Sequence, residues 1–120
     1  MQNESNVGFR RLVNALRFSM KGFRSTYKNE EAFRQEVLLT IILFPLGLWL
    51  GNDAVERILL VGPLLIVLIV ELLNSAIESV VDRISTETHK LSGRAKDQGS
   101  AAVMVSLMLV AISWILVLFF

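Results

Sequence analysis

The chain has 120 residues, of which 53% are apolar and 19% charged, and its twelve Lys and Arg against eleven Asp and Glu leave a net charge of +1. This balance excludes a disordered chain, which needs few apolar residues and a high net charge, and it offers no basic surplus for nucleic acid. With no cysteine and one histidine, the chain lacks a disulfide framework and the ligands of a Cys-based or two-His metal site. We therefore expect one domain over residues 1–120 and no nucleic-acid partner.

The first predicted element is an amphipathic helix over about residues 6–28. Its apolar residues recur at helical spacing and fall within about 50° of one direction, and basic residues occupy an adjoining face. On a membrane protein such a helix lies along the cytoplasmic headgroup layer, and the alternative is that its apolar face packs on the other helices. The apolar set is Phe9, Leu12, Val13, Leu16, Met20, Phe23 and Tyr27, and the basic set is Arg10, Arg17, Lys21, Arg24 and Lys28.

Three later stretches are apolar enough to cross a membrane. Runs without charge cover residues 37–50, 58–70 and 103–120. A helix needs roughly 20 largely apolar residues to span a bilayer core, so we expect transmembrane helices at about 31–50, 54–84 and 93–119. The predicted class is an all-α membrane protein with three transmembrane helices and one surface helix. The alternative, a soluble helical bundle, would wrap its core in too little polar surface.

Capping signals mark the predicted boundaries. Asn29, followed by two glutamates, predicts a helix N-cap with acids in the first turn. Asp53 and Glu56 have the spacing of a capping box at the start of the second span. Ser92, followed by a glycine, predicts the start of the third span.

The distribution of Lys and Arg predicts the topology. Residues 1–34 carry seven of them, the 51–57 turn carries one, and residues 82–98 carry four. The positive-inside rule then places the N-terminus and the 85–92 loop in the cytoplasm. The 51–57 turn and the C-terminus face the other side of a multi-pass protein.

A polar stripe runs along the second predicted span, with Glu71, Asn74, Ser75, Glu78 and Asp82 on one helical face. Acids at membrane depth are costly and usually face a bundle interior or a watery cavity. Glu71 lies ~16 Å deeper than Asp82, at 1.5 Å per residue. We expect Glu78 to hold a hard cation such as Mg²⁺ and the partly desolvated Glu71 to act as a general base. The alternative is a seam of interhelical hydrogen bonds.

The sequence resembles the prokaryotic diacylglycerol kinase family in the string ELLNSAIE at 71–78 and in GRAKD and GSAAV at 93–97 and 99–103. Matches at 21–22, 29–30 and 32–36 extend the resemblance over nearly the whole chain. It implies an enzyme of the bacterial inner membrane that moves the γ-phosphoryl group of ATP to the hydroxyl of diacylglycerol, giving phosphatidic acid. It also implies a homotrimer of three-span subunits, each with an N-terminal surface helix.

The resemblance also assigns roles to residues of this chain. Glu71 is the expected general base, and Glu30 and Glu78 are expected Mg²⁺ ligands, although Glu30 alone could equally cap a helix. Phe18 has no hydroxyl, so its expected role is stacking or packing. The expected ATP-binding residues are Arg11, Phe18, Glu30, Glu78, Glu87, Thr88, His89, Lys96 and Asp97. The expected substrate-binding residues are Arg11, Ala15, Leu16, Arg17, Ser19, Met20, Arg24, Ser25, Thr26, Tyr27, Ala32, Phe33, Arg34, Gln35, Glu36, Trp49, Glu71, Asn74 and Ser100.

Two other functions fit part of this pattern. Undecaprenol kinase belongs to the same broad family and shares the polar stripe, but the strings NSAIE and LSGRAKD favour the diacylglycerol branch. A small proton-coupled transporter could also hold a buried glutamate in a chain of this length. It would not need further acids on the same helical face.

Overall fold

The structure is a computed structural model that describes residues 7–84 and 89–120. It contains four helices: α1 (Phe9–Asn29), α2 (Glu31–Leu50), α3 (Ala54–Ile84) and α4 (Lys90–Phe119). The described ranges hold no β-strand. By length and composition α2, α3 and α4 could each cross a membrane. The predicted all-α class with three long apolar helices and one further helix is therefore confirmed.

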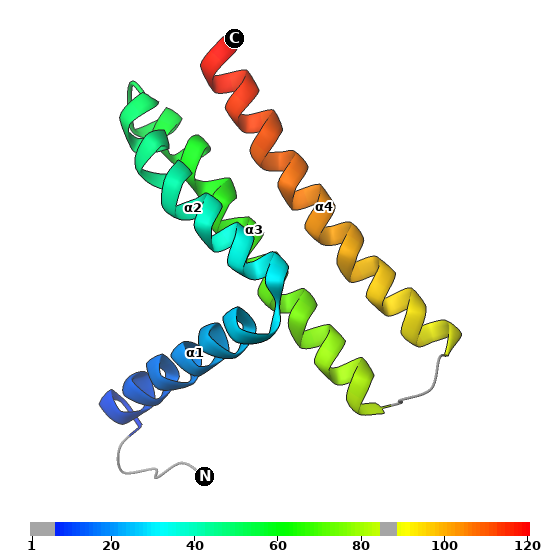
Figure 1. Cartoon of the computed structure of the whole chain (residues 1–120). Helices are drawn as coiled ribbons and strands as arrows, with labels where there is room; N and C mark the ends of the chain where they lie inside the picture. The colour runs from blue at the N-terminus through cyan, green and yellow to red at the C-terminus, as the bar shows by residue number, and fades with distance from the viewer. Residues whose placement is uncertain (1–6, 85–88) are drawn as a thin grey trace.

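The helices form a flat arrangement that measures 48 × 46 × 20 Å along its principal axes. Figure 1 shows α2, α3 and α4 running side by side, while α1 leaves the start of α2 at a steep angle. The α2–α3 turn and the end of α4 lie at one end of the bundle. α1, the end of α3 and the start of α4 lie toward the other end.

The junction between α1 and α2 differs from its prediction. The Asn29 carboxamide donates a hydrogen bond of 2.9 Å to the Ser25 carbonyl, so Asn29 caps nothing in α2. The N-cap position of α2 is occupied by Glu30, whose side chain makes no capping hydrogen bond. The predicted N-cap role of Asn29 is wrong because the side chain folds back on the helix that it ends.

Arg34 ties the two helices together at this junction. Its Nη1 donates to the carbonyl of Tyr27 at 2.8 Å and to that of Lys28 at 3.2 Å. These carbonyls lie in the last turn of α1, where a helix leaves its C=O groups without internal partners and carries partial negative charge. The guanidinium of α2 thereby satisfies the end of α1 and helps fix the angle between the two helices.

The start of α3 confirms the predicted capping box. Asp53 Oδ1 accepts from the Glu56 N–H at 2.9 Å, and Glu56 Oε1 accepts from the Asn52 N–H at 2.9 Å. Arg57 Nε also donates to the Leu48 carbonyl at the end of α2, at 3.0 Å. Side-chain hydrogen bonds therefore satisfy backbone groups at both ends of the turn, at the end of α2 and at the start of α3.

The start of α4 lies earlier than predicted. The helix begins at Lys90, and its N-cap is His89, whose Nδ1 accepts from the Leu91 N–H at 3.0 Å. Ser92, the predicted start, is already inside the first turn. The predicted start at Ser92 is therefore wrong, because the His89 imidazole provides the capping acceptor three residues earlier.

The apolar core lies between α2, α3 and α4 in the half of the bundle nearest the α2–α3 turn. Leu64 and Val67 of α3 pack with Val110 of α4, and Leu43, Phe44 and Trp114 surround them. Trp114 Nε1 donates to the Leu60 carbonyl at 2.9 Å. Such a bond gives the indole a partner where water is absent. Packing and interhelical hydrogen bonds of this kind drive the association of helices in lipid. The hydrophobic effect contributes little there, because the lipid tails are as apolar as the side chains.

The apolar face of α1 is left uncovered by the rest of the described chain. Its exposed fractions range from 37% at Val13 to 80% at Phe9. Among the described rings, one aromatic contact reaches α2, between Phe23 and Phe33 at 6.3 Å. Apart from this contact, most of the face is exposed within this chain. The alternative prediction, in which the face packs on the other helices, does not describe most of its residues.

Candidate functional site

The polar stripe of α3 passes from buried to exposed along the helix. Glu71 and Asn74 are 4% and 9% exposed. Ser75 and Glu78 are half-buried, and Asp82 is exposed. The stripe therefore connects the bundle interior with the surface at the α1 end of the molecule.

The inner part of the site is a buried group of three polar side chains. Glu36 of α2 is 7% exposed, and its carboxyl group lies close to that of Glu71. Asn74 Nδ2 donates to Glu71 Oε2 at 3.4 Å. The group offers a carboxyl that is shielded from water and oriented from two sides, which suits proton transfer.

Two acceptors of this group have no partner. Glu36 Oε2 and Asn74 Oδ1 are buried without a hydrogen bond to any other described residue. Buried polar atoms normally have partners, so unpaired ones call for an explanation. The inner site therefore has acceptors to spare for a donor such as a hydroxyl group.

The outer part of the site is a polar cavity of about 240 Å³ where the α1–α2 junction meets α3. Glu30 and Glu78 both line this cavity, with their carboxyl groups close to each other. The cavity is lined by Ser25, Asn29, Glu30, Ser75, Glu78, Ser79 and Asp82. Two facing carboxylates with hydroxyl neighbours form an oxygen-only donor set.

This donor set fits Mg²⁺ in part. Mg²⁺ is usually held by one or two carboxylates, with water and substrate phosphates completing its shell. Glu30 and Glu78 supply two carboxylates, and residues 7–84 and 89–120 contain no group of three or more His, Asp or Glu placed to hold a metal alone. The residues present therefore suit a cation that arrives with a phosphorylated ligand.

Lys96 of α4 reaches the mouth of the outer cavity. Its Nζ lies 2.8 Å from Asp82 Oδ1, with the side chains 44% and 65% exposed. An ion pair this exposed contributes little stability, so Lys96 can exchange Asp82 for another anion. Its neighbour Asp97 lines a different surface cavity, of about 440 Å³, together with Lys90 and Arg94.

The other predicted nucleotide-binding residues are spread more widely. His89 is exposed and serves as the N-cap of α4, while Glu87 and Thr88 lie outside the described residues. Arg11 and Phe18 are exposed on α1. Arg11 is nineteen residues from Glu30, a distance of about 28 Å along a helix. In this chain Arg11 does not meet the α3 stripe.

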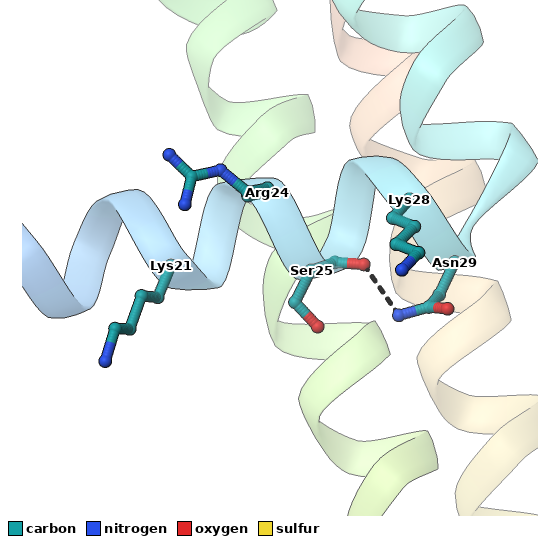
Figure 2. A pocket seen from close by; sticks show the side chains of 5 residues that line it. All are labelled: Lys21, Arg24, Ser25, Lys28 and Asn29. Atoms are coloured by element: carbon teal, nitrogen blue, oxygen red, sulfur yellow. Dashed lines mark hydrogen bonds between the residues drawn. The ribbon is translucent and has the colours of Figure 1, made fainter.

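Nine of the nineteen predicted substrate-binding residues lie on the exposed surface of α1. Figure 2 shows Lys21 and Arg24 extending from this helix in different directions around a shallow cavity of about 330 Å³. The exposed positions on α1 are Arg11, Ala15, Leu16, Arg17, Ser19, Met20, Arg24, Ser25 and Tyr27, whereas Thr26 is buried. The basic side chains do not converge on one point and present a charged surface instead.

The remaining predicted positions lie on α2 and α4. Phe33 is buried, Arg34 is half-buried and occupied by the α1 carbonyls, and Ala32, Gln35 and Ser100 are exposed. Trp49 is 78% exposed near the far end of α2. It is thirteen residues from Glu36, about 20 Å along the helix, and so lies away from the inner site.

Sequence reasoning missed Asn29 and Ser79, which line the outer cavity, and one residue beside the inner site. Gly99 of α4 is buried and packs directly on the Asn74 side chain. A run of small residues from Gly99 to Ala102 was the available signal, because such runs permit helices to approach closely.

The fold and the site together define a small multi-helix membrane protein with an acidic site between its helices. The comparison with known proteins specifies the family. The model of the family described as prokaryotic diacylglycerol kinase matches residues 17–118. The chain belongs to this family.

Curated relatives agree over nearly the full chain. The diacylglycerol kinase of Haemophilus influenzae is 52% identical over 114 residues, covering 95% of this chain and 97% of the relative. The diacylglycerol kinase of Escherichia coli K12 is 47% identical over 114 residues, covering 95% and 93%. That of Pseudomonas aeruginosa is 45% identical over 115 residues, covering 96% and 94%.

Proposed function

We propose that the protein is a membrane diacylglycerol kinase that transfers the γ-phosphoryl group of ATP to the diacylglycerol hydroxyl, yielding phosphatidic acid and ADP. The observation that carries the proposal is the division of the site into a buried carboxyl at Glu71 and an accessible carboxylate pair, formed by Glu78 of α3 and Glu30 of the α1–α2 junction. The names of the curated relatives agree with this function.

In the proposed reaction Glu71 accepts the proton of the lipid hydroxyl. The hydroxyl oxygen bonds to the γ-phosphorus as the bond from that phosphorus to the β–γ bridging oxygen breaks, and ADP leaves with that oxygen. The Asn74 amide orients Glu71 through the 3.4 Å hydrogen bond. Because little covalent chemistry falls to the protein, most of the catalysis is positioning and charge neutralisation.

Glu30 and Glu78 are the proposed holders of Mg²⁺, which when bound neutralises phosphate charge. Lys96 is the proposed phosphate contact, since its exposed partner Asp82 is replaceable. Arg11, Phe18, Glu87, Thr88, His89 and Asp97 stay predictions as nucleotide contacts, and the exposed α1 positions stay predictions as lipid contacts.

The proposed assembly is a homotrimer whose sites are shared between subunits. Support comes from the ~28 Å of helix between Arg11 and Glu30, which keeps Arg11 away from the polar stripe of its own chain. The exposed apolar surfaces of the three long helices also leave the stripe thinly shielded. Mixing Glu71→Gln with Arg11→Ala subunits should restore activity above either parent. No recovery in crosslinked hetero-oligomers would contradict a shared site.

The proposed location is the bacterial cytoplasmic membrane, with α1 on the cytoplasmic side. The concentration of Lys and Arg in residues 1–34 and 82–98 supports this orientation. Labelling of single introduced cysteines in intact cells and in inverted vesicles would test it.

The proposed activity is tested with purified protein in lipid bilayers and radiolabelled ATP. Diacylglycerol, undecaprenol and a saturated hydrocarbon form the substrate panel, and Glu71→Gln is the negative control. Label in phosphatidic acid supports the proposal. Label in undecaprenyl phosphate alone, or proton flux without ATP consumption, would contradict it.

A further inference from the structure

Gly99 of α4 lies against the inner site and has no side chain that could take part in the reaction. It is one of three buried residues on α4. A Cβ built at this position would overlap Asn74 Oδ1 and would lie 3.1 Å from Asn74 Cγ. The backbone of α4 therefore touches the carboxamide that bonds to Glu71.

This contact constrains the position of the Asn74 side chain. The carboxamide has a donor end, Nδ2, and an acceptor end, Oδ1, and Nδ2 donates to Glu71 Oε2. Oδ1 is buried, has no hydrogen-bond partner among the described residues, and faces the glycine. The space at Gly99 lets the carboxamide lie between the α4 backbone and Glu71, at the distance from which Nδ2 donates to the carboxylate.

We propose that Gly99 is a positioning residue, which holds the Asn74 carboxamide against Glu71 by letting the α4 backbone contact its oxygen. Any side chain at this position displaces Asn74 and thereby misorients the general base. The inference rests on the proposed kinase function for its catalytic consequence. The steric pairing of Gly99 with Asn74 is independent of that function.

The same helix offers a matched control. Gly93 lies six residues earlier on α4, and a Cβ added there would meet nothing within 4 Å. Alanine favours helices over glycine at both positions. A loss specific to Gly99→Ala therefore cannot come from helix propensity.

The kinetic test compares Gly99→Ala and Gly93→Ala with the wild-type protein in bilayers containing diacylglycerol. We expect Gly99→Ala to lower kcat on the order of 100-fold, the loss typical of a misplacement near 1 Å. The KM for ATP should stay unchanged, because the outer cavity is untouched, and Gly93→Ala should match the wild type. Wild-type kcat in Gly99→Ala, or an equal loss in Gly93→Ala, would overturn the proposal.

A double-variant cycle tests whether Gly99 acts through Asn74. Gly99→Ala should lower the melting temperature in the wild-type background and leave it unchanged, or raise it, in the Asn74→Ala background, where the overlap is gone. Equal losses in both backgrounds would overturn the proposal. If Gly99→Ala alone fails to fold, folding of the double variant supports the pairing, and its failure overturns it.

The cycle also separates this inference from the proposed function. Melting temperatures are readable in protein without catalytic activity. A wild-type protein that fails to phosphorylate diacylglycerol would refute the kinase proposal, while the cycle would still report on the Gly99–Asn74 contact.

Discussion

The two halves of α3 use the same neighbouring helices for opposite purposes. From Leu60 to Val67 the helix is packed by apolar side chains, and the Trp114 N–H has a carbonyl partner. From Glu71 to Asp82 its inward face is polar, and two buried acceptors are unpaired among the described residues, Asn74 Oδ1 on this face and Glu36 Oε2 on the facing α2. Unpaired buried acceptors reduce stability, so the polar half depends on the apolar half to hold the helices in place.

This difference predicts that substitutions in the polar half lower activity without unfolding the protein. Glu71→Gln should show the largest effect, a decrease in kcat of about 10² to 10⁴-fold, because the shape remains while the proton acceptor is lost. The measurement is phosphate transfer to diacylglycerol per folded protein, with the exposed Glu31→Gln as control. Wild-type turnover in Glu71→Gln would remove Glu71 from the mechanism.

Glu78→Gln probes the outer cavity of the same half. Because one of two facing carboxylates is lost, we expect the Mg²⁺ concentration for half-maximal rate to rise by about 10- to 100-fold. A titration of the rate with Mg²⁺ measures this shift, and a chelator should abolish activity in both proteins. An unchanged Mg²⁺ requirement would assign Glu78 a structural role.

In the apolar half the effects should fall on stability. Leu64 is 1% exposed, and Leu64→Ala should cost about 2 to 3 kcal/mol of unfolding free energy through the cavity it leaves. The activity of the molecules that remain folded should match wild type. The adjacent Leu65, which is 46% exposed, provides the control: Leu65→Ala should cost much less. Equal destabilisation by the two variants would contradict the core placed here.

Trp114→Phe should have the smallest effect. It removes the 2.9 Å hydrogen bond to the Leu60 carbonyl, and hydrogen bonds between membrane helices are worth about 0.6 kcal/mol on average. Thermal unfolding in lipid should show a slightly lower melting temperature for Trp114→Phe than for the control variant Ile115→Val, which changes an exposed residue. If Trp114→Phe changed kcat without changing stability, the apolar half of α3 would have a direct effect on the chemistry of the polar half, which contradicts the division described above.

Features encoded locally were predictable from the sequence. The three long apolar helices follow from runs of apolar residues, and the Asp53–Glu56 capping box follows from a spacing of three residues. The shared face of the polar residues on α3 follows from helical periodicity, because residues three or four apart lie on the same side of a helix.

Features that depend on the angle or register between helices were not predictable. The Asn29 side chain can cap either helix at the junction, and the direction of the chain decides that it bonds to Ser25. Arg34 finds the α1 carbonyls for the same reason. Gly99 meets Asn74 across 25 residues of sequence, so its contact appears only once α3 and α4 are placed side by side.

The unequal lengths of α2 and α3 have a consequence for depth. Both helices leave the same short turn, and α2 has 20 residues while α3 has 31. At 1.5 Å per residue α2 measures about 30 Å, the thickness of a bilayer's hydrocarbon layer, and α3 exceeds it by about 16 Å. With α2 spanning that layer, Glu71 lies just inside its boundary, and the segment from Asn74 to Ile84 overhangs into the headgroups. The difference in length between α2 and α3 thus sets the depth of the α3 carboxylates relative to the edge of the hydrocarbon layer.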